Sequence, residues 1–242
     1  MAGQEHHPDG TTEEARPFGS LRVRLLHRRA SHSHGVVLGL LVVSFVFMAT
    51  ASDARWTASV LVLLQSATLV CALWTSGLAA ATSWPSLGFI ALATGAAVVN
   101  LVWNGSTLTA VVAGLSGLLT FGITFVIALS VLDQTEVNGQ SIMGAICIYI
   151  LLGMIFLFVF GVIAAAGSGP FFVQGTDGTR SLRLYFSYVT LATLGYGDYT
   201  AAGKLGHALA VSEALLGQLY LVTVVAVLVT RMGQRRERRR SG

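Results

Sequence analysis

Residues 193–198 read Thr-Leu-Gly-Tyr-Gly-Asp, and the twelve residues before them, 181–192, read SLRLYFSYVTLA. The twelve-residue stretch is apolar enough for a helix and contains neither glycine nor proline. Because an α-helix rises about 1.5 Å per residue, this helix would be about 18 Å long. A hydrocarbon core is about 30 Å thick, so the helix can enter a membrane but cannot cross it. The residues that follow must therefore bring the chain back out as non-helical backbone.

The returning segment alternates glycine with larger residues, at Gly195 and Gly197. Glycine adopts backbone angles that are closed to other residues. A segment of alternating backbone handedness can point successive carbonyl oxygens to the same side. Non-helical backbone at membrane depth is tolerated only where it is buried in protein or lines a water-filled path. We therefore expect stacked rings of carbonyl oxygens that replace the water around a bare cation.

The surrounding sequence has the composition of an integral membrane protein. Of the 242 residues, 54% are hydrophobic and only 11% are charged, whereas soluble domains carry about 25% charged residues. No Asp, Glu, Lys or Arg occurs between Trp56 and Leu132, and this run is longer than one bilayer crossing. The predicted fold class is an all-α membrane protein with six transmembrane helices plus one re-entrant pore helix per subunit. We place the spans at 35–51, 56–76, 84–103, 107–132, 141–166 and 204–231.

The pattern divides the chain into four parts. Residues 1–33 are a polar tail with a basic interfacial segment, and 34–132 form a four-helix transmembrane domain. Residues 133–232 form a pore domain, and 233–242 are a basic tail. The two ends of the chain, 16–29 and 231–240, hold five and six of the 15 Lys and Arg residues. By the positive-inside rule both termini are expected in the cytoplasm. The expected location is a prokaryotic plasma membrane. We expect anionic lipid near the basic tails, and no nucleic acid.

The hexapeptide TLGYGD at 193–198 is very similar to TVGYGD, the signature of potassium channels. Residues 185–198 resemble the pore helix and filter of that family, and 213–229 resemble its inner helix, so the resemblance covers about 141–232. It implies passive, potassium-selective conduction and no cofactor besides K⁺ in the filter. One filter segment cannot encircle an ion, so we expect three further identical subunits and a homotetramer. The expected filter consists of Thr193, Leu194, Gly195, Tyr196 and Gly197, with K⁺ held by the carbonyls of the first four and by the Thr193 hydroxyl.

The filter region departs from the family pattern at three positions. Leu194 replaces the usual valine, which keeps the carbonyl and changes the packing behind it. Val189 stands where some relatives have a carboxylate that pairs with the aspartate after the filter. Asp198 therefore needs another partner, and Tyr185 stands where many relatives have tryptophan. We expect the Tyr185 phenol to hydrogen-bond Asp198 and brace the filter.

The last span offers candidates for gating. Gly217 stands at the hinge position of the family, although close helix packing explains a glycine there equally well. Glu213 is the one carboxyl side chain inside this span, which makes it a candidate pH sensor together with His207. A hydrogen bond to the pore helix would also account for Glu213. The resemblance implies that the cavity and inner gate are lined by Gln218, Leu221, Val225 and Val229.

The first four spans do not resemble a voltage sensor. Such sensors carry several arginines on the fourth span, and 107–132 carries none, so we expect voltage insensitivity. Gln65 and Asn100 are polar groups in apolar spans and are expected to hydrogen-bond between helices. The alternatives are a non-selective cation channel on the same scaffold and a secondary transporter, although transporters commonly pair two broken helices. The spans lack the clustered His, Asp, Glu, Ser or Cys of an enzyme, so we expect no enzymatic activity.

Overall fold

The computed structural model of the chain describes residues 33–76, 84–103, 106–132 and 139–240, and these ranges are built from helices. The expected interfacial segment before residue 33 lies outside them. The helix bounds agree with the expected spans to within a few residues, except that the last helix continues through much of the expected tail to Arg240. Arginine and glutamine favour helix, and no proline stops it there. The helices are α2 (Ser33–Thr50), α3 (Arg55–Ser76), α4 (Trp84–Val102), α5 (Ser106–Leu132), α6 (Gly139–Ala166), α7 (Arg180–Leu191) and α8 (Gly203–Arg240).

Four of these helices contain stretches long and apolar enough to cross a membrane. They are Trp56–Thr75 in α3, Val111–Leu132 in α5, Gly139–Ala166 in α6 and Gly203–Val227 in α8. The apolar parts of α2 and α4, Gly35–Thr50 and Ser86–Val102, are shorter. The all-helical membrane fold is therefore confirmed, and the number of six spans stays a prediction.

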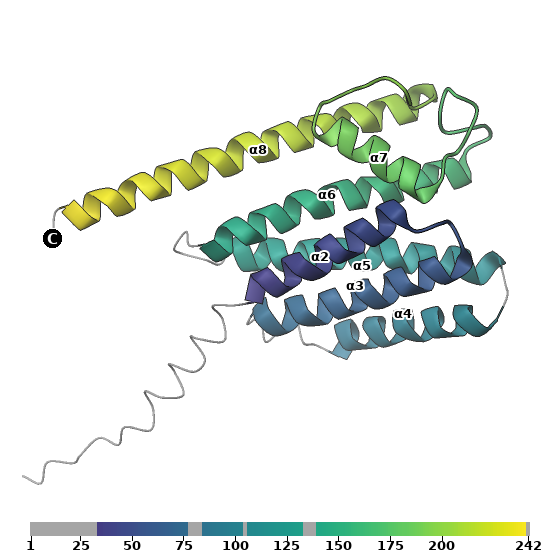
Figure 1. The fold of residues 1–242 in the computed structure, drawn as a ribbon, viewed down its shortest axis with the longest axis horizontal. Coiled ribbons are helices and arrows are strands. Elements are labelled where there is room, and N and C mark those ends of the chain that lie inside the picture. The colour runs from purple at the N-terminus through teal and green to yellow at the C-terminus, as the bar shows by residue number, and fades with distance from the viewer. Residues whose placement is uncertain (1–32, 77–83, 104–105, 133–138, 241–242) are drawn as a thin grey trace, which may run out of the picture.

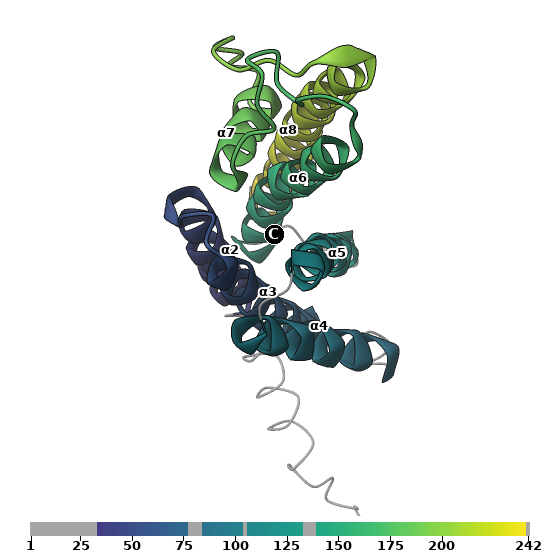
Figure 2. The ribbon, with the colours of Figure 1, turned by 90° about the vertical axis from the view of Figure 1, so that its right-hand side faces the viewer.

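The helices form two groups that share α6. Helices α7 and α8 lie on one side of α6, and α2 and α5 pack against it from the other side, with α3 and α4 beyond them (Figures 1 and 2). The C-terminal half of α8 extends away from the other helices (Figure 1). As a result, the short helix α7 lies between the inner helix α8 and the end of the N-terminal helix group.

The N-terminal group is held by apolar packing with a few polar pairs between helices. Small and branched residues such as Ala93, Ala97 and Val112 are fully buried, which allows close helix contacts inside a membrane. The Gln65 amide donates to Thr120 Oγ1 at 2.8 Å, and the Asn100 amide donates to Ser59 Oγ at 3.0 Å. The expected interhelical hydrogen bonds of these two residues are thus confirmed.

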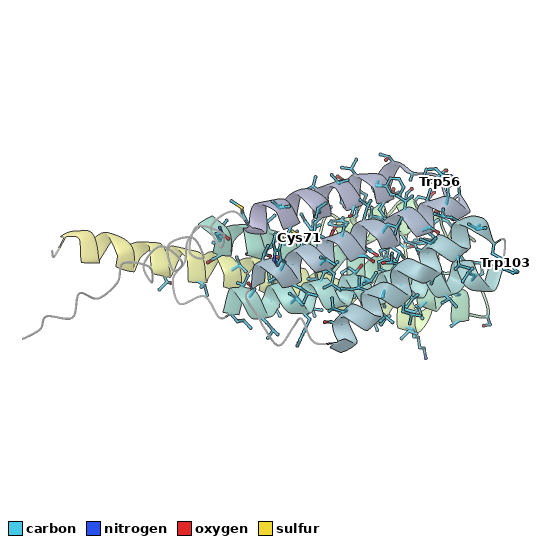
Figure 3. All side chains as sticks on the ribbon, turned by 90° about the horizontal axis from the view of Figure 1, so that it is seen from below. Trp56, Cys71 and Trp103 are labelled. Carbon is cyan, nitrogen blue, oxygen red and sulfur yellow. The ribbon has the colours of Figure 1, made fainter. Side chains whose placement is uncertain are left out.

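Two tryptophans mark one end of the N-terminal group. Trp56 at the start of α3 and Trp103 after the end of α4 lie at the same end, whereas Cys71 lies towards the other end (Figure 3). Both indole rings are at least half exposed. Tryptophan prefers the membrane–water interface. Their common level agrees with antiparallel neighbouring helices and with a membrane boundary at this end.

The short helix α7, which the sequence predicted as a pore helix, is defined by its ends. The Thr179 side chain caps the helix by accepting a hydrogen bond from the Leu182 amide at 3.1 Å, as an N-cap threonine does. Leu184, Phe186 and Leu191 are buried. Phe186 packs in an aromatic cluster with Phe160 of α6 and with Phe172, from the segment before α7. This packing fixes α7 beside α6 and sets the position of the residues that follow it.

Candidate ion-conduction site

The backbone from Thr193 to Gly197 alternates in handedness. The φ angles of Thr193, Gly195 and Gly197 are +56°, +56° and +76°, while Leu194 and Tyr196 between them have no positive φ. Alternation of this kind turns successive peptide planes so that their carbonyl oxygens can face one side. A positive φ is uncommon for a β-branched residue, and strained backbone of this sort clusters at functional sites. Thr193 is the only non-glycine residue with such a φ in the part of the chain that the structure describes.

The C-terminus of α7 holds the start of this segment. The Val189 carbonyl accepts the Leu194 amide at 2.9 Å and the Gly195 amide at 3.4 Å, and the Thr190 carbonyl accepts the Thr193 amide at 2.9 Å. The first three N–H groups of the segment are therefore bonded to carbonyl groups of α7. Within the described part of the chain, no recorded donor bonds the carbonyls of 193–197, so these oxygens remain available to a cation. The negative end of the α7 dipole is aimed at the same place.

The Thr193 hydroxyl has a partner on the inner helix. Gln218 of α8 donates its side-chain amide to Thr193 Oγ1 at 2.9 Å. A hydroxyl oxygen has two lone pairs, so one remains for an ion after this bond. The structure thus brings Gln218, expected on the cavity wall, to the inner end of the filter segment.

Asp198 is held through its side chain by Tyr185. The Tyr185 hydroxyl donates to Asp198 Oδ2 at 2.8 Å, so the expected hydrogen bond is present, and its bracing role stays a prediction. The Tyr185 ring also stacks on Tyr196, with centroids 6.5 Å apart and an interplanar angle of 19°. The hydrogen bond to Asp198, followed by burial, raises the pKa of the Tyr185 phenol above its ordinary value of 10.0.

Asp198 is also held through its backbone, by a residue that the sequence did not indicate. The Gln174 side chain donates to the Asp198 carbonyl at 2.9 Å and accepts from the Thr200 amide at 3.3 Å. Gln174 lies in a turn before α7, and backbone hydrogen bonds join this turn to the residues after the filter, with Val173 donating to the Thr200 carbonyl at 3.0 Å. In the sequence this residue is a single glutamine between α6 and α7, without a motif around it.

A second unanticipated contact joins the N-terminal helix group to the pore helix. The Arg180 amide at the start of α7 lies 3.3 and 3.4 Å from the two carboxyl oxygens of Asp53, between α2 and α3. The Arg180 guanidinium donates to Thr57 Oγ1 at 3.3 Å. Burial lowers the pKa of Arg180, and the nearby Asp53 opposes this effect. A carboxyl group at a helix N-terminus is favourable to the helix dipole.

The inner helix approaches the pore helix at Gly217. A Cβ atom at this position would collide with the Leu191 carbonyl oxygen and would lie 2.8 Å from Leu191 Cδ1. Glycine is therefore required for the close approach, while its hinge role stays a prediction, because α8 is continuous through it. Leu221 and Val225 on the same helix are exposed in the single chain. The side chain of Val229 lies outside the described residues.

Glu213 of α8 is fully buried where this helix faces α7. Its Oε1 lies 2.5 Å from Ser187 Oγ, which also donates to the Gly153 carbonyl of α6 at 2.8 Å. The expected hydrogen bond to the pore helix is thus present. His207, the other candidate pH sensor, lies in the first turns of α8, where its side chain is exposed.

Residues 144–234 match a family model described as Ion channel. The match begins in α6, covers α7 and the filter segment, and ends in α8, which is the part of the chain that the sequence assigned to the pore. No solved structure matches the chain. The match points to a channel rather than an enzyme, and with the apolar helices it indicates an integral membrane protein. The C-terminal part of this chain, residues 144–234, is thus similar to an ion-channel domain.

Proposed function

We propose that the chain is one subunit of a homotetrameric channel that conducts K⁺ passively and selectively. The observation that carries the proposal is the alternating backbone at Thr193, Gly195 and Gly197. It supports a segment in which the carbonyls of Thr193, Leu194, Gly195 and Tyr196 and the Thr193 hydroxyl replace the hydration shell of K⁺. Rings of backbone carbonyls are the means by which potassium filters select their ion.

The surroundings of the filter favour potassium over a non-selective cation pore on the same scaffold. A selective filter must keep its diameter, because its oxygens replace water only at the right spacing. In this chain the outer end is held by Tyr185 and Gln174 through Asp198, and the inner end by Gln218. Leu194 exposes 56% and Tyr196 67% of its surface in the single chain, which leaves room for packing by a neighbouring subunit.

The exposed apolar surface of α8 supports the tetramer. Large hydrophobic side chains at Val211, Leu215, Leu219 and Val222 are each more than half exposed. Among the residues of α8 whose burial the structure describes, only Gly206, Glu213 and Gly217 are buried. Four copies around one axis would bring these inner helices together and close the ring of carbonyls. A cyclic assembly is the usual form of such homo-oligomers.

The remaining parts of the proposal concern the membrane. We infer that α2 and α4 also cross the bilayer, which makes six spans and places both basic ends in the cytoplasm near anionic lipid. The described part of α5 carries no arginine, so the N-terminal helix group supports the pore without sensing voltage. A secondary transporter would need a second broken helix, and among the described residues α7 is the one short helix followed by extended chain.

The test is a reversal potential in planar bilayers with K⁺ on one side and Na⁺ on the other. We expect reversal close to the potassium potential in the parent channel. We expect loss of selectivity in Gly195→Ala, where a Cβ would meet no atom of the chain within 4 Å but would be held at a φ of +56°. The left-handed region costs about 1–2 kcal/mol for an L-residue. Gly88→Ala in α4, also free of contacts, is the matched control. A reversal near zero in the parent would replace the proposal by a non-selective pore.

A further inference from the structure

Three helices meet at one hydroxyl group behind the filter. Ser187 of α7 is fully buried, and its Oγ lies 2.8 Å from the Gly153 carbonyl of α6 and 2.5 Å from Glu213 Oε1 of α8. Glu213 has 0% exposure, and its Oε2 has no hydrogen-bond partner among the described residues. The junction therefore joins the outer helix, the pore helix and the inner helix through two side chains.

Counting protons decides the direction of these bonds. A serine hydroxyl has one proton to donate, and the Gly153 carbonyl can only accept. If Ser187 donates to Gly153, then the proton between Ser187 and Glu213 must belong to the carboxyl group. An ionised Glu213 would instead accept a hydrogen bond from Ser187. The contact between Ser187 and the Gly153 carbonyl would then have no proton, and Oε2 would be a charged oxygen without a partner among the described residues.

The surroundings of Glu213 offer nothing to stabilise a charge. Among the described residues, the titratable side chains close enough to be coupled to Glu213 are Tyr149 of α6 and Tyr188 of α7, and neither can supply a positive charge. No Arg, Lys or His among the described residues forms an ion pair with it. An isolated carboxylate removed from water is very costly, and such a group normally stays neutral instead. A neutral acid satisfies all recorded contacts and leaves only one carbonyl oxygen without a partner.

We propose that Glu213 is a protonated carboxylic acid that donates to Ser187 and fastens α8 to α7 behind the filter. Glu213 is a positioning residue that holds α7 against α8, and its effect on the filter rests on the function proposed above. Ser187 stands two residues before Val189, whose carbonyl accepts the Leu194 and Gly195 amides. Movement of α8 at Glu213 is therefore transmitted to the start of the filter through one turn of α7.

The protonation state is tested by infrared spectroscopy on the full chain in proteoliposomes at neutral pH. We expect a C=O stretching band of a protonated carboxylic acid that is lost in Glu213→Gln. The same band should shift in frequency in Ser187→Ala, because its hydrogen-bond partner is gone. The matched control is Ser212→Ala on α8, whose exposed hydroxyl donates to the Ala208 carbonyl of its own helix. Parent and Glu213→Gln spectra without a difference in this region would overturn the proposal.

The positioning role is tested by K⁺ flux into the same proteoliposomes. A glutamine amide in place of the acid can still donate to Ser187, so Glu213→Gln should keep the parental flux. Glu213→Ala cannot donate and should lose flux more than tenfold, and Ser212→Ala should leave flux unchanged. Equal flux from the alanine and parent proteins would remove the positioning role. The infrared band does not require conduction, so its loss or persistence is distinguishable from a failure of the channel proposal.

Discussion

The outer end of the filter depends on one glutamine, and replacing it gives a sharp prediction. The Gln174 side-chain amide makes two hydrogen bonds to the backbone after the filter: it donates to the Asp198 carbonyl and accepts from the Thr200 amide. Gln174→Met keeps the length of the side chain and removes both hydrogen bonds. Gln174→Glu keeps the acceptor for Thr200 and loses the donor to Asp198. The two variants thus separate the bond to Asp198 from the bond to Thr200.

The size of the effect follows from the two contacts. A neutral hydrogen bond contributes about 0.5–1.5 kcal/mol net, and these two bonds at 2.9 and 3.3 Å are exposed, which puts them in the lower half of that range. Together they amount to about 1–2 kcal/mol, which is a factor of about 5–30 in an equilibrium constant. We expect Gln174→Met to shift the ratio of conducting to non-conducting filters by this factor.

The assay is single-channel recording in planar bilayers with K⁺ on both sides. The ratio is the time that the open pore spends conducting, divided by the time in long closures. We expect these closures to be shortened by raised K⁺ on the outer side, because ions in the filter oppose its collapse. The matched control is Val173→Met, since the neighbouring side chain is exposed and its backbone bond to Thr200 is kept.

Two results would refute the reasoning. A Gln174→Met channel with the same closures as the Val173→Met control would show that Gln174 does not hold the outer end. A Gln174→Glu channel that behaves as the parent would show that the bond to the Asp198 carbonyl contributes nothing. A double variant with Tyr185→Phe should deviate from additivity, because both side chains act on Asp198 and groups that share a partner couple.

The remaining predictions concern the pore helix and its neighbours. The pKa of Tyr185 is raised in the folded chain, so its hydrogen bond to Asp198 is fully present below pH 10.0 and is lost as the pH rises through the raised pKa. Conduction by the parent channel should therefore fall as the pH rises above 10.0. Tyr185→Phe should lack this fall in bilayer recordings. Gly217→Ala should lower the stability of the purified assembly by about 1–3 kcal/mol, because the added Cβ overpacks against Leu191. Thermal unfolding measures this beside the control Gly114→Ala, whose added Cβ has no atom within 4 Å. If Gly217 served only as a flexible hinge, alanine would instead stabilise the helix by about 1 kcal/mol. Asp53→Asn should lower the stability of the assembly by about 0.3–1 kcal/mol at low salt, because a negative charge is lost at the N-terminus of α7. A loss of stability that added salt does not reduce would contradict this explanation.

The helices were predictable because their physical signals are local. Apolar runs of about 20 residues separated by polar breaks define α3, α5, α6 and α8, and a twelve-residue stretch too short to cross defines α7. The alternation of handedness in the filter was also predictable from Gly195 and Gly197, since glycine tolerates positive φ. The left-handed angle of Thr193 was not, because nothing in a threonine favours it and the surrounding hydrogen bonds impose it.

The contacts that hold the filter in place could not be predicted, because they join residues that carry no pattern. Asp53 and Arg180 are 127 positions apart, and Gln174 and Asp198 are 24 apart. Each is a single polar residue in a loop or at a helix end, where its chemistry fits many roles. Tyr185 was the exception, since the absence of a carboxylate at Val189 left Asp198 in need of a partner within reach.

The distribution of these contacts has a mechanical consequence. The filter segment is held at its outer end by Gln174 and Tyr185, at its inner end by Gln218, and from behind through α7. Helix α7 is in turn bonded to Glu213 of α8 and to Asp53, which lies between α2 and α3. A movement of the N-terminal helices therefore reaches α7 before the filter segment, whereas a movement of α8 also reaches that segment directly through Gln218 and Thr193. In the proposed channel, whose helix α5 carries no arginine, a stimulus on the N-terminal helices would then change conduction through the position of α7.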